Sequence, residues 1–95
     1  MSEYLHHLKA AVTALHGCDC LHSGTSRVTY FHAGKKIFDG RVETFSLIGH
    51  QEAFEAYAWA ISNGDQLQYL AVLKVLPIWD ASDAVAAVII TRSVH

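Results

Sequence analysis

The segment from Gly49 to Trp59 constrains the fold of this chain more than any other stretch. Its apolar residues fall at the i, i+3, i+4 and i+7 positions of a 3.6-residue repeat, namely Phe54, Tyr57, Ala58 and Ile61. This spacing is typical of one buried helix face. The sequence therefore predicts a helix over residues 50–62.

Two residues of this predicted helix invite a functional role. Trp59 would lie about 140° around the axis from Phe54, away from the apolar stripe. An indole there packs on the flank of the core, lies in a subunit interface or lines a ligand pocket, and the sequence leaves these three roles open. His50 falls near the helix N-terminus, where free N–H groups and the helix dipole favour a neutral imidazole. We expect His50 to make a capping or structural hydrogen bond, with general-base chemistry as the alternative.

Composition bears on assembly. The chain has 95 residues, of which 52% are hydrophobic and 17% charged, against a usual charged share of about 25%. A domain of this size buries only about 60–65% of the surface of its unfolded chain. We therefore predict one α+β domain over residues 1–95 that hides apolar surface in a homodimer. The candidate interfaces are an open sheet edge, the Trp59 flank, and the last helix with Val85, Val88, Ile89 and Ile90.

Charge and hydropathy exclude several classes of partner. The formal net charge of −2 argues against nucleic acid, because phosphate binding requires a positive field. The first residues lack the basic flank and the apolar run of a signal peptide. No stretch approaches the ~20 apolar residues that span a bilayer. These features predict a cytoplasmic protein without a membrane partner.

Two cysteines and two histidines alternate over a short segment, as His16, Cys18, Cys20 and His22. On an extended strand all four side chains would point to one side, and their atoms suit a soft metal. Zinc sites, however, separate their cysteines by two to four residues so that the chain can turn around the ion. We therefore predict reduced cysteines, no metal and no cofactor.

The remaining elements follow from local signals. Residues 2–16 read as a helix with Ser2 as N-cap and Gly17 as its stop. Residues 20–48 are rich in β-branched and aromatic residues and predict two strands. A turn at residues 33–36 would pair Phe31 with Phe38 and make Gly40 a bulge in one long second strand, whereas a turn at residues 39–40 is the competing choice. We favour the first turn.

The C-terminal third predicts one strand and one further element. Residues 63–65 form a turn, and residues 67–76 are apolar enough for an interior strand covered on both faces. Asp80 or Ser82 caps a last element over residues 84–94, a helix or alternatively a fourth strand. The predicted order is α-β-β-α-β-α, with the helices packed on a three-stranded mixed sheet.

The second part of the chain carries a set of residues that resembles a known group. These are Gly34, Gly40, Val42, Glu43, Phe45, Leu47, Gly49, His50, Ala53, Tyr57, Ala58, Trp59, Ala71, Val72, Leu73, Pro77, Ser82, Ala84 and Val85. The pattern G-H-P-x-A followed by Y-A-W resembles small uncharacterised bacterial and environmental proteins, some of them encoded on mobile integron gene cassettes. Gln51 and Asp83 stand where that pattern has prolines, which alters helix starts and no chemistry. The resemblance implies the fold and supplies no activity.

Three functions remain open, since the chain has no Walker loop, G-x-S-x-G, C-x-x-C or paired-histidine motif. The leading one is a small dimeric binding or interaction protein. The alternative is a small-molecule enzyme with His50 as base beside a pocket, whose candidate ligand-binding residues are Glu52, Tyr57, Trp59 and Asp80. The third is a weak nucleic-acid binder through the hairpin at residues 27–41, using Arg27, Lys35, Lys36 and Arg41 with Tyr30 and Phe31.

Overall fold

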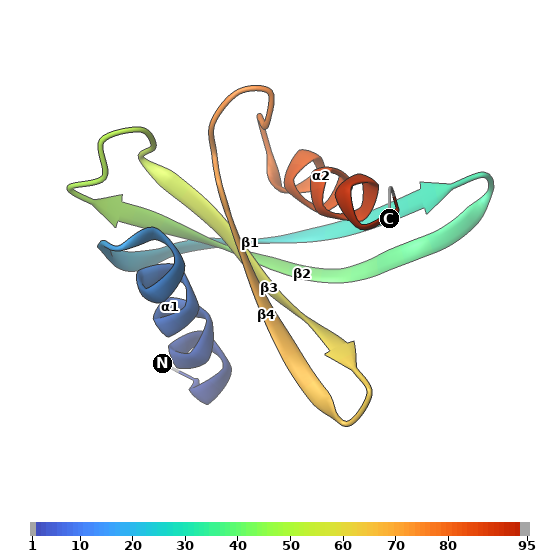
Figure 1. The fold of residues 1–95 in the computed structure, drawn as a ribbon, viewed down its shortest axis with the longest axis horizontal. Coiled ribbons are helices and arrows are strands. Elements are labelled where there is room, and N and C mark those ends of the chain that lie inside the picture. Colours follow the sequence, from blue (N-terminus) through green and yellow to red (C-terminus); the bar gives the residue numbers. More distant parts are fainter. Residues whose placement is uncertain (1, 94–95) are drawn as a thin grey trace.

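The computed structural model describes residues 2–93 as a four-stranded sheet with one helix on each face (Figure 1). The elements are α1 (Glu3–His16), β1 (Asp19–His32), β2 (Lys35–Ile48), β3 (Glu55–Asn63), β4 (Gln66–Leu73) and α2 (Ala81–Ser93). The strands are antiparallel throughout and lie in the order β1-β2-β3-β4. The predicted α+β class is confirmed. The predicted three-stranded mixed sheet is wrong, and the element order is α-β-β-β-β-α.

The segment predicted as a helix over residues 50–62 is a loop followed by strand β3. Its side chains alternate between large and small: Tyr57 and Trp59 point to one face of the sheet, while Ala56 and Ala58 point to the other. All four are buried, because β3 lies inside the sheet and is covered on both faces. When nearly every position is apolar, some apolar residues fall at helical spacing by coincidence. In such a segment the alternation of large and small side chains is the stronger indication of a strand.

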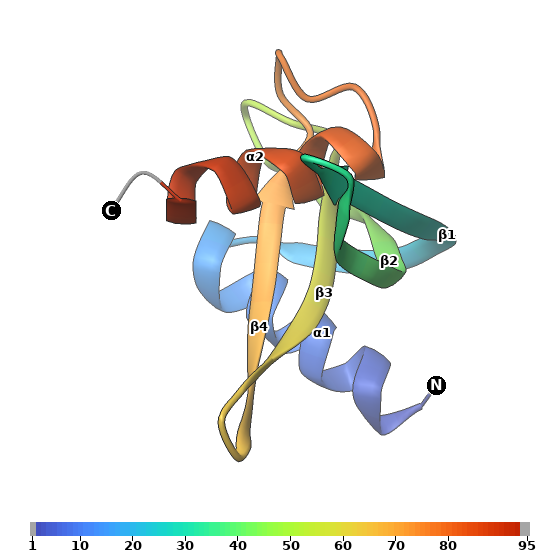
Figure 2. The ribbon, with the colours of Figure 1, turned by 90° about the vertical axis from the view of Figure 1, so that its right-hand side faces the viewer.

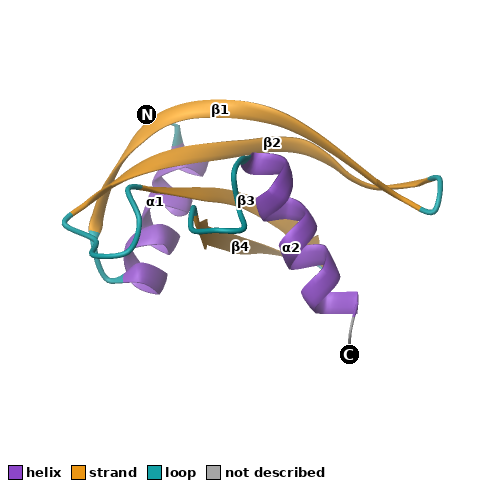
Figure 3. Cartoon of the chain, turned by 90° about the horizontal axis from the view of Figure 1, so that it is seen from above, coloured by secondary structure: helices purple, strands orange, loops and turns teal. Residues whose placement is uncertain are grey.

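The two helices cover opposite faces and different ends of the sheet (Figures 1 and 3). The core under α1 consists of Leu8, Val12, Cys20, Phe45, Ala56 and Ala58. The core under α2 consists of Val28, Val42, Tyr57, Trp59, Ala81, Ala84 and Val85. The small alanines of β3 face α1 and the large aromatic residues face α2, so β3 contributes to both cores at once.

Strand β2 is as long as predicted, but its details differ from the prediction. The favoured turn is confirmed, with Ala33 and Gly34 at φ of 52° and 77° joining β1 to β2. Gly40 is no bulge, because it pairs in register with Val28. The extra residues lie at Ser23 and Ile37 instead. The second of these bulges shifts the aromatic pair, so that Phe38 lies opposite Tyr30 and not opposite Phe31.

The apparent change of inward face along β2 needs no bulge at Gly40. Val42 belongs to the core under α2, whereas Phe45 belongs to the core under α1. These residues lie on opposite faces by the ordinary alternation of a strand. Each face is inward where its own helix covers it, and β2 passes from one helix to the other (Figure 2).

The ends of both helices follow the predicted chemistry. Ser2 Oγ accepts the N–H of Leu5 at 3.2 Å, and Gly17 ends α1 in the left-handed conformation at φ 69°. The last element is a helix, and Asp80 caps it by accepting the N–H of Asp83 at 2.9 Å. Within residues 2–93, no helix has the length and apolar character needed to cross a membrane.

Strand β4 differs from the prediction in position. The apolar run over residues 67–76 predicts an interior strand, yet β4 is an edge strand. Its side chains nevertheless pack on both cores, with Leu70 and Val72 on one face and Tyr69 and Leu73 on the other. Coverage of both faces, and not an interior position, accounts for its apolar composition.

The packing of Trp59 generates a stability prediction. Its side chain is 2% exposed and meets Phe38 edge to face, with 6.3 Å between ring centroids. We expect Trp59→Ala to lower the free energy of unfolding by about 3–5 kcal/mol in a urea titration, because it opens a large cavity. The control Leu15→Ala alters a side chain that is 60% exposed and should cost less than about 1 kcal/mol. Equal losses in the two variants would contradict this packing.

Candidate functional site

His50 has a structural role in the loop before β3. Its Nδ1 accepts the N–H of Glu52 at 3.0 Å and the N–H of Ala53 at 3.2 Å. A ring nitrogen that accepts carries no proton, so His50 is neutral with its proton on Nε2. The predicted structural hydrogen bond is therefore present, although no helix follows. The side chain of Glu52 is exposed.

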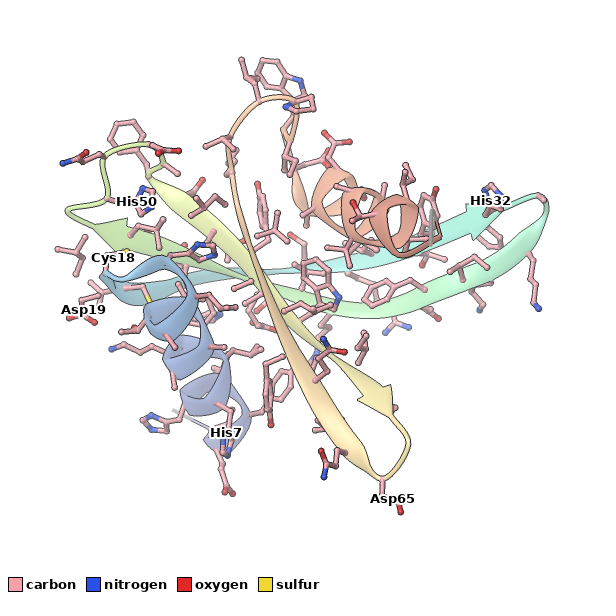
Figure 4. All side chains as sticks on the ribbon, in the orientation of Figure 1. His7, Cys18, Asp19, His32, His50 and Asp65 are labelled. Carbon is pink, nitrogen blue, oxygen red and sulfur yellow. The ribbon has the colours of Figure 1, made fainter. Side chains whose placement is uncertain are left out.

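Tyr57 and Trp59 lie on the face of the sheet that α2 covers. Trp59 lines an apolar cavity of about 360 Å³ between α2 and the two hairpins, together with Ile37, Phe38, Ile61, Leu70, Val85, Val88 and Ile89. His50 lies beside the C-terminal end of α1, where its ring meets that of His16 at 6.4 Å between centroids (Figure 4). The structure thus does not bring His50 to Trp59. Asp80 is occupied as the cap of α2.

A cluster of exposed apolar side chains lies where β3 begins and β4 ends. Phe54 is 89% exposed, Leu76 70% and Trp79 68%. They line a shallow groove of about 240 Å³, which we call the Trp79 surface and which comprises Phe54, Glu55, Lys74, Leu76, Ile78 and Trp79. Glu55 and Lys74 form an ion pair at 3.3 Å within it. This surface was not predicted from the sequence, although a tryptophan directly after Pro77-Ile78 in a loop was a usable signal.

A polar pocket of about 290 Å³ lies between the first turn of α1 and the β1–β2 hairpin. Glu43, in this pocket, is the one buried charged side chain among the described residues, at 4% exposure. Its Oε1 accepts the Nε2–H of His22 at 2.9 Å and the hydroxyl of Thr25 at 2.5 Å. This site was not predicted from the sequence either. The usable signal was the position of Glu43 two residues before Phe45, because residues two apart on a strand share a face and this face is buried at Phe45.

Three of the four alternating cysteines and histidines, His16, Cys20 and His22, make separate contacts. His16 Nε2 lies 3.0 Å from the carbonyl oxygen of Ala71, and the Cys20 thiol donates to the carbonyl of Lys9 at 3.8 Å. His22 is bonded to Glu43. Both cysteines are free. In the part of the chain that the structure describes, no three His, Cys, Asp or Glu side chains are grouped so as to hold a metal ion.

No family model, curated protein or solved structure matches the chain. The resemblance to integron cassette proteins therefore stays a prediction, and the site is argued from its own geometry.

The two thiols should differ in reactivity. Burial raises the pKa of the Cys20 thiol, so less of it is the reactive thiolate at neutral pH. Cys18 is only partly buried. We expect the Cys18→Ser protein to react with Ellman's reagent at least about tenfold more slowly than the Cys20→Ser protein at pH 7.5. In urea the two rates should converge, and equal rates in the folded proteins would contradict the burial of Cys20.

Proposed function

We propose that the protein is a small binding protein that acts as a homodimer and meets its second copy through the Trp79 surface. The observation that carries this proposal is the exposure of Phe54, Leu76 and Trp79 side by side. Aromatic side chains dominate the binding energy of protein interfaces, and contiguous exposed apolar patches mark interaction sites.

The total surface of the chain supports a partner. The accessible surface is 6118 Å², whereas a monomer of 10.5 kDa exposes about 5,400 Å². The radius of gyration of 13.1 Å also exceeds the value of about 12.4 Å expected for 95 residues. The excess of about 700 Å² is close to the ~800 Å² that each partner buries in an interface of standard size.

The chemistry of the Trp79 surface favours a second copy as that partner. In a two-fold dimer the same patch meets itself, so any net charge on it would repel. Glu55 and Lys74 neutralise each other within the surface. The patch therefore presents aromatic and aliphatic groups around a neutral ion pair, which is compatible with self-association.

This surface differs from two of the interfaces that the sequence predicts. Trp59 and Val85 are 2% and 1% exposed within their own core and are closed to a partner. Of the apolar residues predicted on the last helix, Ile90 is the one that is more than half exposed, at 57%. The edges of the sheet at β1 and β4 remain open to pairing.

A small apolar ligand is the second candidate, supported by the cavity that Trp59 lines under α2. Its volume of about 360 Å³ falls in the range of ligand sites, which is about 300–1,000 Å³. The enzyme alternative has less support, because His50 lies on the α1 side and its Nδ1 is used by the loop. The nucleic-acid alternative is weakened because Asp39 pairs with both Arg27 and Lys36.

Sedimentation of variants tests the homodimer. At about 50 µM we expect the wild-type chain to sediment at twice its mass of 10.5 kDa, in the range where a standard interface is populated. Trp79→Ser should sediment as a monomer, because it removes the largest apolar group of the surface. The matched control Leu15→Ser changes a residue on α1 that is also mostly exposed, at 60%, and should stay dimeric. A monomeric wild type, or a dimeric Trp79→Ser variant, would overturn the proposal.

A further inference from the structure

The polar pocket at the first turn of α1 contains a carboxylate–imidazole pair that the proposed homodimer does not use. Glu43 Oε1 accepts hydrogen bonds from both His22 and Thr25. Because the carboxylate accepts from Nε2, neutral His22 has its proton there and a lone pair on Nδ1. No described residue makes a hydrogen bond to Nδ1, and the His22 side chain is 26% exposed. One edge of the ring is therefore available to a bound molecule.

Arg41 supplies a positive charge to the same pocket. It lies two residues from both Asp39 and Glu43 on one strand face, and directly opposite Arg27 on β1. Among the described residues Arg41 has no ion pair, because Asp39 pairs with Arg27 at 2.9 Å and with Lys36 at 3.5 Å. Asp39 already compensates Arg27, so Arg41 is the guanidinium of this cross-strand pair that is left to bind an anion.

Tyr4 extends from α1 to the pocket. Burial is the largest influence on its hydroxyl and raises the pKa of Tyr4, and a backbone hydrogen bond at Ala60 lowers it in part. The hydroxyl therefore stays protonated at neutral pH and serves as a neutral donor. The charges of Glu43 and Arg41 act on the hydroxyl in opposite directions, the first raising the pKa of Tyr4 and the second lowering it.

We propose that this pocket binds a small organic anion whose carboxylate pairs with Arg41 while its other end lies against His22. A guanidinium binds a carboxylate through two parallel hydrogen bonds, and this geometry is the reason for choosing an organic acid. The volume of about 290 Å³ limits the ligand to a small molecule. The pocket shares no residue with the Trp79 surface, so the proposal stands apart from the homodimer.

The groups around His22 determine which end of the anion lies against it. The groups around His22 are Glu43 and Arg41 from β2, Thr25 from its own strand, Phe45 in edge contact and Tyr4 from α1. The negative charge of Glu43 disfavours a second carboxylate beside it. The carboxylate of the ligand therefore lies at Arg41, and the uncharged part of the ligand lies at His22.

Benzoate is the probe that tests this site, with benzamide as its uncharged counterpart. We expect benzoate to shift the ring signals of His22 and Tyr4 in NMR titrations, and benzamide to leave these signals unmoved. Arg41→Gln should weaken benzoate binding at least about tenfold, because it removes a charged bidentate partner. The matched control is Arg27→Gln, which alters the opposite residue outside the pocket and should change affinity less than about threefold.

A third variant tests the effect of the negative charge of Glu43 on binding. Glu43→Gln keeps a side-chain oxygen for His22 and Thr25 and removes the negative charge that disfavours a carboxylate in the pocket, so its benzoate affinity should rise. If Glu43→Gln does not fold, the comparison of Arg41→Gln with Arg27→Gln still decides. The proposal is overturned if benzoate causes no shifts up to about 10 mM, a concentration that detects affinities of only a few kcal/mol. Equal binding of benzamide, or equal losses in the two arginine variants, would overturn it as well.

Discussion

The structure depends on strand β3 being buried on both faces at once. Ala56 and Ala58 let α1 approach one face closely, while Tyr57 and Trp59 fill the space under α2 on the other. Because the two cores share the backbone of one strand, neither helix can be displaced without exposing part of β3. In this chain of 95 residues the structure describes two helices, so covering both faces of the sheet takes one helix for each face.

With one helix on each face of the sheet, other apolar residues stay uncovered. The two helices cover different ends of opposite faces (Figure 1), so each face has an open end. Phe54, Leu76 and Trp79 lie in loops, and neither helix covers their side chains, so these side chains stay exposed. The same geometry leaves polar residues partly enclosed at the edge of the α1 core, where Glu43 is buried beside His22. Both proposed sites are thus consequences of where the helices end.

Sequence patterns predicted those elements whose signals are local. Ser2 and Gly17 mark the ends of α1 by backbone chemistry alone, and Asp80 marks the start of α2 in the same way. The turn at Ala33-Gly34 is also local, because it requires positive φ at two residues. The type of the segment at 55–63 was predicted wrongly, because a strand buried on both faces lacks the alternation of polarity that identifies most strands.

The candidate site was less predictable for a different physical reason. His22, Glu43 and Arg41 meet through the register of β1 with β2, and that register depends on bulges at Ser23 and Ile37. Gly24 directly follows the first bulge, but a single glycine does not fix the register, and the bulge at Ile37 has no glycine beside it. His50, in contrast, stood out in the sequence because of its neighbours, and its nitrogen is used to hold the loop together.

The backbone contacts of Ala58 test the central claim most directly. In the structure Ala58 lies opposite Glu43 on β2 and opposite Ala71 on β4. Nuclear Overhauser spectra of the uniformly labelled protein should show cross-strand backbone contacts from Ala58 to both neighbouring strands, together with strand-type carbon shifts over residues 55–63. Contacts between the α-proton of one residue and the amide three residues later across that segment would show a helix instead, and would contradict the account.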